Sequence, residues 1–308
     1  MVEKCPNVDI LLEPSRHVEA VLAFKEFFLL SDRPTGLDLL KSILVSFSEF
    51  PYENISKIIK YRRHFGEAER IRLPWEVMEG HAEHRLGGTC FSLTYFLQTI
   101  LSREGFSCYP VMADMRWGEN VHCALVVTVD SLKYLVDPGY LLSEPMALDS
   151  QKPRMYTASF SGVELVFDAE RGKYDLYTFD GMQKKWRYRF WDRPVSAEEF
   201  YGHWLSSFGW NSMHGLCLTK VEKGGMVYVH KHFMRETSMG VKRNFNIKKD
   251  YHETIRAVFG IDPQLVEKAL AALEVNMARE REMGLWVPKS QKNTTEQHRT
   301  TQNNKEYD

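Results

Sequence analysis

Cys90 is the residue whose sequence neighbourhood points most directly to chemistry. It follows Gly87-Gly88-Thr89 and begins an apolar stripe with helical spacing, formed by Leu93, Phe96, Leu97, Ile100 and Leu101. A cysteine at the start of a helix lies beside unpaired N–H groups and the positive end of the helix dipole, and both favour its thiolate. Because the thiolate is the form that attacks an acyl carbonyl, we predict that Cys90 is a nucleophile.

His122 and Asp137 are predicted to serve this nucleophile, because a hairpin would place them side by side. If Asp130-Ser131 form a two-residue turn, His122 lies opposite Gly139, and Asp137 is its diagonal neighbour on the same sheet face. Cys123 then points to the other face, where we expect it only to pack. Asp137 would orient the imidazole, His122 would deprotonate the thiol, and N–H groups at the helix start would bind the oxyanion. This arrangement predicts acyl transfer through a thioester.

Four segments of the sequence resemble those of the arylamine N-acetyltransferases, in the same order and with similar spacing. The family's P-F-E-N segment, its glycine pair and cysteine, its histidine strand and its D-x-G-[FY] segment are matched by Phe50–Asn54, Gly87–Phe91, His122–Leu125 and Tyr134–Tyr140. Two later family segments are similar to Phe200–Ser212 and Val258–Ile261. The likeness extends over roughly residues 15–275.

The resemblance implies a reaction and a set of contacts. A Cys-His-Asp triad on a papain- and transglutaminase-like core would pass an acetyl group from acetyl-CoA to an arylamine in a ping-pong reaction. Tyr140 and Gly139 would line the pocket for the small amine acceptor, Ser212 would contact coenzyme A, and no metal would take part. The resemblance also implies a helical domain, a β-barrel domain and an α/β lid.

The sequence departs from the family pattern next to the nucleophile. Leu86 stands where the family has an arginine before the glycine pair, and Arg85 lies one residue earlier. After Cys90 the family commonly has Phe-Glu-x-Asn, whereas this chain has Phe91-Ser92-Leu93-Thr94. We therefore expect that an ion pair beneath the nucleophile is displaced and that the polar network beside the thiol is altered.

The elements that must position these residues give an α+β fold class: an N-terminal helical unit that carries the nucleophile, a central antiparallel β-barrel or meander, and a C-terminal α/β lid. Helical periodicity appears at 16–30, 36–49 and 90–105, and again at 251–259 and 264–281. Strands are expected at 106–114, 121–129, 132–137, 155–160, 163–167, 173–178, 184–191, 215–221 and 226–233. The predicted domains are 1–88, 89–200 and 201–287, followed by a disordered tail at 288–308.

Charge and composition argue against several other kinds of protein. The formal charge of -1 provides no field that would attract nucleic acid. The basic and aromatic stretch 184–191 is explained by alternation, with Trp186, Tyr188 and Phe190 facing a core while Arg187 and Arg189 face water.

No apolar run reaches the length of a membrane span, and the start does not resemble a secretory signal. Five scattered cysteines favour the reducing cytoplasm over a disulfide framework.

Three alternatives remain open on the sequence alone. The same triad could belong to a transglutaminase-like thiol amidase or peptidase, which releases the acyl group to water. The altered residues beside Cys90 could instead mark a non-catalytic binding homologue. His81 and His84 could join Cys90 as zinc ligands, although Glu83 and Arg85 indicate a solvated loop and a fourth ligand is missing.

Overall fold

The computed structural model describes residues 7–30, 34–63, 66–180, 183–210, 213–222 and 224–284. The predicted disordered tail, 288–308, lies outside these ranges. The helices are α1 (Val8–Leu11), the 3-10 helix η1 (Pro14–His17), α2 (Val18–Phe27), α3 (Gly36–Phe47), α4 (Ile55–Arg63), α5 (Glu67–Arg70), α6 (Pro74–His84), α7 (Cys90–Arg103), α8 (Ala197–Ser206), the 3-10 helix η2 (Ser207–Gly209), α9 (Tyr251–Phe259) and α10 (Pro263–Glu282).

The helices predicted from periodicity are present, and α7 is the most deeply buried of the N-terminal group. Its stripe residues pack with the apolar faces of α2, α3 and α6 in one hydrophobic cluster. The prediction missed the short helices α1 and α5, and also α4, α6 and α8. Helix α4 was missed because the basic residues of its last turn obscure the apolar periodicity of its buried side. These residues are Lys60, Arg62 and Arg63. His81 is buried in α6 and hydrogen-bonds to the Leu86 carbonyl, so the predicted solvated loop was wrong there.

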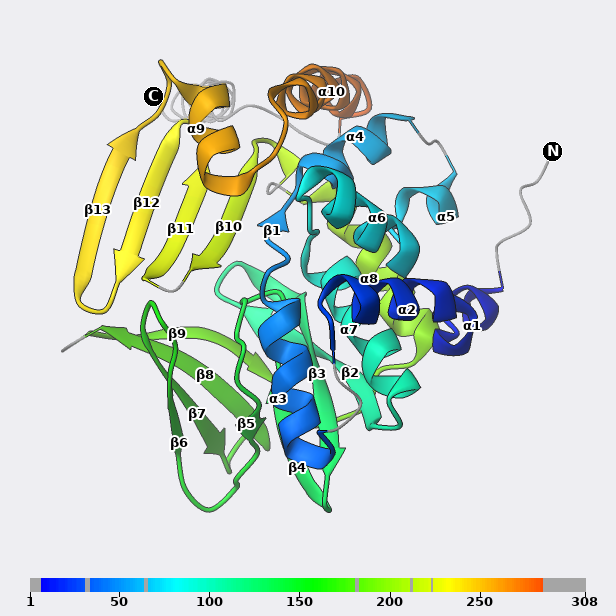
Figure 1. The fold of residues 1–308 in the computed structure, drawn as a ribbon, viewed down its shortest axis with the longest axis vertical. Coiled ribbons are helices and arrows are strands. Elements are labelled where there is room, and N and C mark those ends of the chain that lie inside the picture. The colour runs from blue at the N-terminus through cyan, green and yellow to red at the C-terminus, as the bar shows by residue number, and fades with distance from the viewer. Residues whose placement is uncertain are drawn as a thin grey trace, which may run out of the picture.

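The strands form two antiparallel sheets (Figure 1). The eight-stranded sheet has the order β5-β4-β3-β2-β9-β8-β7-β6, and its members are β2 (Ser107–Met115), β3 (Gly118–Val129), β4 (Leu132–Val136), β5 (Met146–Ala147), β6 (Arg154–Thr157), β7 (Gly162–Asp168), β8 (Lys173–Asp180) and β9 (Gln183–Phe190). The five-stranded sheet has the order β1-β10-β11-β12-β13, formed by β1 (Tyr52–Glu53), β10 (Cys217–Glu222), β11 (Gly225–His230), β12 (Phe233–Ser238) and β13 (Val241–Asn246).

The eight-stranded sheet curls until its two edges nearly meet. The edge strands β5 and β6 approach each other, and the Ala147 N–H donates to the Tyr156 hydroxyl between them. Inward-facing side chains of β2, β3, β7, β8 and β9 fill the interior as a separate apolar cluster. The mixed fold with a central antiparallel barrel is therefore as predicted.

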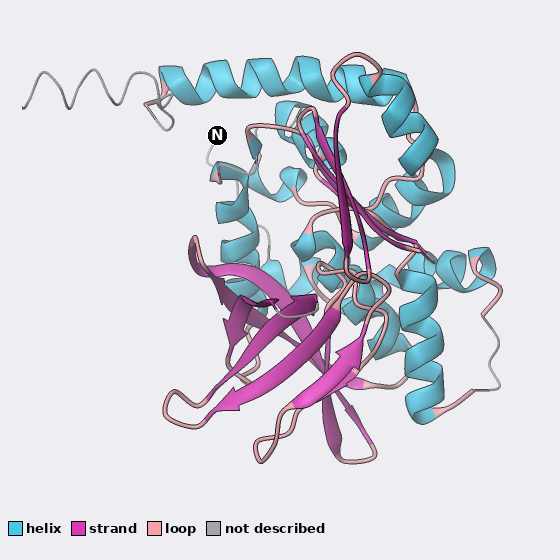
Figure 2. Ribbon diagram, turned by 90° about the vertical axis from the view of Figure 1, so that its left-hand side faces the viewer, coloured by secondary structure: helices cyan, strands magenta, loops and turns pink. Residues whose placement is uncertain are grey.

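The five-stranded sheet packs with the C-terminal helices and joins the N-terminal half of the chain. Apolar residues of β10, β11, α9 and α10 share one cluster, and Figure 2 shows the two sheets as separate groups of strands. Strand β1 comes from the N-terminal helical region, yet Tyr52 pairs with Thr219 of this sheet.

The predicted strand at 226–233 is interrupted, because Lys231 adopts a positive φ of 54° and begins a turn between β11 and β12. The three domain boundaries stay a prediction.

Strand β9 contains an irregularity that the alternation argument did not anticipate. Leu176 pairs with Tyr188 and Tyr177 pairs with Trp186, which leaves Arg187 as an extra residue in a β-bulge. Tyr188 and Phe190 face the barrel core as predicted. Trp186 does not, because its indole N–H bonds to Asp175 on the other face, and Arg187 lines a cavity inside the curled sheet instead of its outer surface.

None of the helices in the described part of the chain is long and apolar enough to cross a lipid bilayer.

Candidate active site

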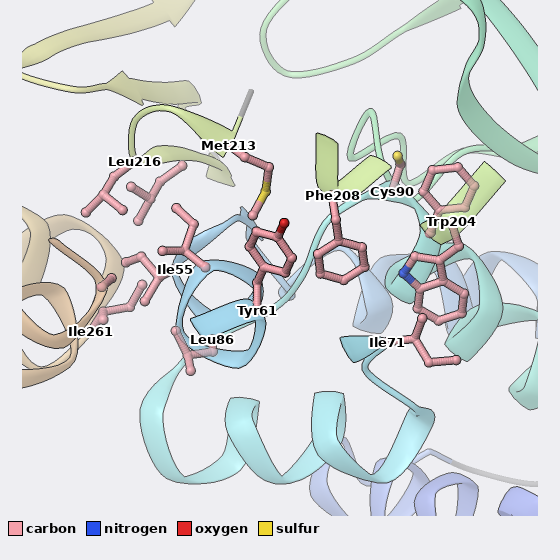
Figure 3. Packing of buried hydrophobic residues seen from close by; sticks show 14 of the residues in the cluster. Ile55, Tyr61, Ile71, Leu86, Cys90, Trp204, Phe208, Met213, Leu216 and Ile261 are labelled. Carbon is pink, nitrogen blue, oxygen red and sulfur yellow. The ribbon is translucent and has the colours of Figure 1, made fainter. Parts of the chain in front are cut away.

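Cys90 is the first residue of α7, as the sequence indicates, and it lies at the edge of a large apolar cluster. Thr89 before it is extended, so the chain turns into the helix at Cys90, where the first backbone N–H groups have no partner within the helix. The side chain is only 6% exposed. Figure 3 shows it among the cluster that contains Trp204 and Phe208. The thiol is therefore held in an apolar, largely dry position.

The hairpin between β3 and β4 has the predicted register. Asp130 and Ser131 both have positive φ, as a two-residue hairpin turn requires. The two strands pair in the register that this turn predicts, as far as Leu125 with Val136. Asp137 directly follows the ladder and is fully buried. Its Oδ2 lies 2.9 Å from Nε2 of His122, and its Oδ1 accepts the Tyr140 N–H at 2.9 Å. The carboxylate therefore fixes both the histidine and the loop that follows.

Gly139 lies between the thiol and the imidazole. A Cβ added there would be 2.8 Å from Cys90 Cβ and 2.9 Å from His122 Cε1, so the two side chains flank the same glycine. The structure thus brings Cys90, His122, Asp137 and Gly139 together in one place, with the first three at most 6% exposed.

Charge and hydrogen bonding favour an ionised thiol. A hydrogen bond with Cys123 has the largest effect and lowers the pKa of Cys90; burial opposes it, and the bonding and charge of His122 and then Lys57 lower the pKa further. The net result lies well below the usual thiol range. Burial lowers the pKa of His122, but Asp137 and Cys90 outweigh this effect and raise it to about 10. A thiolate–imidazolium pair is therefore the favoured state at neutral pH.

Cys123 and Lys57 take part in this arrangement although the sequence analysis assigned them no such place. Burial raises the pKa of the Cys123 thiol, so that thiol stays protonated next to Cys90, and its Sγ lies 3.5 Å from Thr94 Oγ1, to which it donates. Lys57 of α4 is buried, and its ammonium donates to the Ser207 carbonyl at 3.0 Å and lies 4.4 Å from the centre of the Phe208 ring. Burial lowers the pKa of Lys57 to about 7. Lys57 lies among buried residues at the start of α4, and a lysine at such a position is the sequence signal that could have identified it as part of the site.

Arg72 forms an ion pair next to the glycine pair that precedes Cys90. Arg72 donates to the Gly87 carbonyl at 2.5 Å and to Ser56 Oγ at 2.7 Å, and it lies 3.5 Å from the buried Glu53 carboxylate. Arg85 instead ends α6 with a positive φ and lies over the Phe27 ring. The positive charge next to the glycine pair is therefore that of Arg72, which precedes α6 in the sequence.

A cavity of about 530 Å³ opens onto these residues. Cys90, His122, Gly139 and Tyr140 line it, as do aromatic side chains that include Trp117, Phe160, Phe179, Trp210 and Tyr228. The predicted coenzyme contact Ser212 lies outside the described residues. Cationic side chains of the described residues also line this space: Lys185, Arg187, Arg235 and Lys242. The cavity can hold a small aromatic molecule against the thiol.

A metal centre finds no support in the side chains that the structure describes. Within those ranges there is no group of three or more His, Cys, Asp and Glu residues that could hold an ion. His81 has its Nδ1 bonded to the Leu86 carbonyl and packs 4.1 Å from the Phe50 ring centre, and burial lowers its pKa to about 4. This histidine is a neutral part of the core.

Comparisons with known proteins agree with this architecture. Residues 36–268 match the N-acetyltransferase family. The arylamine N-acetyltransferase of Mycobacterium abscessus has a similar structure, with a TM-score of 0.70 and 18% identity over 85% of this chain and 97% of that one. The Salmonella typhimurium enzyme gives a TM-score of 0.67 and 16% identity over 82% and 98%. The Bacillus cereus enzyme, described with a Cys-His-Glu catalytic triad, gives 0.63 and 16% over 79% and 99%.

A curated relative is similar in sequence over a shorter stretch. It is the uncharacterized acetyltransferase L280 of Acanthamoeba polyphaga mimivirus, which is 26% identical over 123 residues, or 37% of this chain. The matched region spans 57% of that viral protein, less than two thirds of its length. Because the family match covers most of the chain and the fold agrees with it, this protein belongs to the arylamine N-acetyltransferase family.

Proposed function

We propose that this protein transfers an acetyl group from acetyl-CoA to an arylamine, with the acetyl group carried as a thioester on Cys90. One observation supports the proposal above all: Cys90 and His122 flank Gly139, and Asp137 fixes His122, at a cavity large enough for both reactions. Membership of the family gives acetyl transfer; the donor, the acceptor class and the residue roles are our proposal.

The two half-reactions use the same three side chains. The Cys90 thiolate attacks the acetyl carbonyl, and backbone N–H groups at the start of α7 stabilise the oxyanion. The carbon–sulfur bond to coenzyme A then breaks, and the imidazolium of His122 gives its proton to the departing thiolate. The arylamine next attacks the Cys90 thioester. Neutral His122 accepts the amine proton as the Cys90 thiolate leaves, which restores the starting ion pair.

The cavity supplies features that acetyl-CoA needs. Lys185 of β9 and Lys242 of β13 are exposed side chains that line it, and Arg235 lies on β12, the strand that pairs with β13. Cations are suited to the phosphate groups of coenzyme A. The thiol itself is buried behind aromatic side chains, which limits access of water to the thioester. These features favour transfer to an amine over hydrolysis.

Intact-mass spectrometry after incubation with acetyl-CoA tests the proposal. We expect one added acetyl group, absent in Cys90→Ala, which is removed when an arylamine is supplied. The Cys108→Ala variant is a matched control, because Cys108 lies away from this cavity and should leave labelling unchanged. A protein that takes no acetyl group would contradict the proposal. A thioester that is lost to water as fast as to amines would favour a thiol hydrolase.

A further inference from the structure

Strand β13 forms an exposed edge of the five-stranded sheet. It is the last strand in the order of that sheet, and it lies at the outer flank of the molecule in Figure 1. All six of its residues are exposed, and they include Val241 at 49% and Phe245 at 39%. The strand at the other edge, β1, is bridged to Gly88. Within the described part of the chain, β13 is therefore the edge of this sheet that is open to pairing.

Half of the backbone polar groups of β13 point away from the sheet. The Ile247 N–H donates to the His232 carbonyl at 2.9 Å, and β12 and β13 pair without a shift in register. Hydrogen-bonded and non-hydrogen-bonded pairs alternate along an antiparallel ladder, so every second residue counted back from Ile247 bonds inward to β12. The outward N–H and C=O groups therefore belong to Lys242, Asn244 and Asn246.

The structure of β13 does little to prevent a further strand from pairing with it. Soluble proteins commonly protect an edge strand with a proline, a bulge or charged side chains. Strand β13 contains no proline and no bulge, and the ion pair of Lys242 with Asp180 ties it to the barrel, so a pairing strand would find a regular edge already in place. Its only charged residues are Lys242 and Arg243, so these two cations decide which strand can pair here.

The sequence of β13 is complementary to itself in one antiparallel register. Outward-pointing residues must pair with outward-pointing residues, which a register centred on Asn244 achieves. Lys242 then lies opposite Asn246 of a second copy, and Arg243 lies opposite Phe245, where the guanidinium can contact the ring. No like charges face each other. Centring on Lys242 or Arg243 would oppose two cations, and centring on Phe245 would pair only three residues of each strand.

We propose that two copies of this chain form a dimer through β13, with a twofold axis at Asn244, so that their five-stranded sheets become one continuous antiparallel sheet. The inference does not depend on the reaction proposed above. Twofold dimers are the commonest oligomers, and a formal charge of -1 gives little repulsion between two copies. Directly opposed residues share a sheet face, so Asn246 of the partner subunit would lie next to Lys242, which lines the cavity. The partner strand would thus extend the cavity wall.

Sedimentation velocity of the full chain between about 1 and 200 μM tests the dimer. One pair of strands is a small interface, so we expect a monomer–dimer equilibrium with a dissociation constant on the order of 10 μM. Asn244→Pro removes an outward N–H while the ladder to β12 stays intact, and it should weaken dimerisation by at least about 10-fold. Asn244→Ser keeps that N–H and should dimerise like the wild type. Thermal unfolding scans check that both variants are folded.

Asn244→Cys tests the register. Opposed residues in a hydrogen-bonded pair have Cα atoms about 5.5 Å apart, which a disulfide can span, so mild oxidation should link the two chains at position 244. Asn246→Cys is the matched control, because it has the same outward direction and exposure but would lie about 14 Å from its copy. Peptide mapping identifies the linked position, since the chain has five other cysteines.

Several outcomes would overturn the proposal. A chain that stays monomeric up to the highest concentration would do so, as would a dimer that Asn244→Pro does not weaken. Linkage in the Asn246→Cys variant without linkage in Asn244→Cys would show a different register. Dimerisation that occurs only after residues 285–308 are removed would assign the β13 edge to that segment of the same chain, and the proposed dimer would be wrong.

Discussion

Replacing Gly139 with alanine should disable the site while leaving the fold in place. The new methyl group would lie 2.8 Å from Cys90 Cβ, 2.9 Å from His122 Cε1 and 3.2 Å from Cys90 Cα, all closer than the 3.4 Å at which ordinary van der Waals contact begins. The third contact is to backbone, which cannot rotate away, so the start of α7 or the imidazole must shift. Because a 1 Å misplacement can cost about 100-fold, we expect kcat/KM to fall by about 10- to 100-fold.

The assay for this variant is the single-turnover rate of Cys90 acetylation, followed by intact mass, together with a thermal unfolding scan. Overpacking should destabilise the protein by about 1 to 3 kcal/mol, which leaves it folded at room temperature. Gly202→Ala is the matched control, because Gly202 lies in α8 with nothing within 4 Å of an added Cβ, and its acetylation rate should not change. A Gly139→Ala protein that acetylates at the wild-type rate would refute the reasoning that Cys90 and His122 flank this residue.

Three further predictions concern charge at and below the nucleophile. Because the pKa of Cys90 lies below its usual range, iodoacetamide should alkylate it at a constant rate at and above neutral pH and more slowly only on acidification, whereas an ordinary thiol would show a rise centred at about 8.5. Lys57→Met removes a group that lowers the pKa of Cys90, so the pH at which alkylation slows on acidification should move upward, and Lys57→Arg should move it less. Arg72→Met leaves the buried Glu53 carboxylate without its ion pair and should lower the free energy of unfolding by about 3 to 5 kcal/mol, measured by urea denaturation; an unchanged midpoint would contradict that role.

The register of the β3–β4 hairpin could be predicted because it depends on local chemistry. Asp130 and Ser131 accept the positive φ of a two-residue turn, and side chains alternate along each strand, so the placement of Asp137 beside His122 follows from counting residues. The same counting failed in β9. A bulge depends on the partner strand and on packing around it, and nothing in the stretch 183–190 itself distinguishes a bulged strand from a regular one, so the inward position of Arg187 needed the structure.

The sequence also could not predict which residues from distant segments lie near Cys90. Arg72 precedes α6 and Lys57 lies in α4, and neither belongs to a motif with the cysteine. Their positions follow from tertiary packing, in which α4 lies against α10 and α6 against α7. Leu86 before the glycine pair predicted an altered ion pair there, and only the structure shows that Arg72 contacts the Gly87 carbonyl and Glu53.

Two of the sequence segments that carry the family resemblance turn out to be one structural unit. The Gly88 N–H donates to the Pro51 carbonyl at 3.3 Å and the Glu53 N–H donates to the Gly88 carbonyl at 2.9 Å, so β1 and the loop before Cys90 form a short parallel bridge. A Cβ on Gly87 would lie 1.9 Å from the Pro51 carbonyl oxygen, which explains why a glycine is needed there. Since β1 is also the edge strand of the five-stranded sheet, this bridge connects the nucleophile directly to the sheet that forms the far wall of the cavity. The position of the Cys90 thiol is therefore set jointly by the helical region and by that sheet, so the thiol is fixed between the two walls of the cavity.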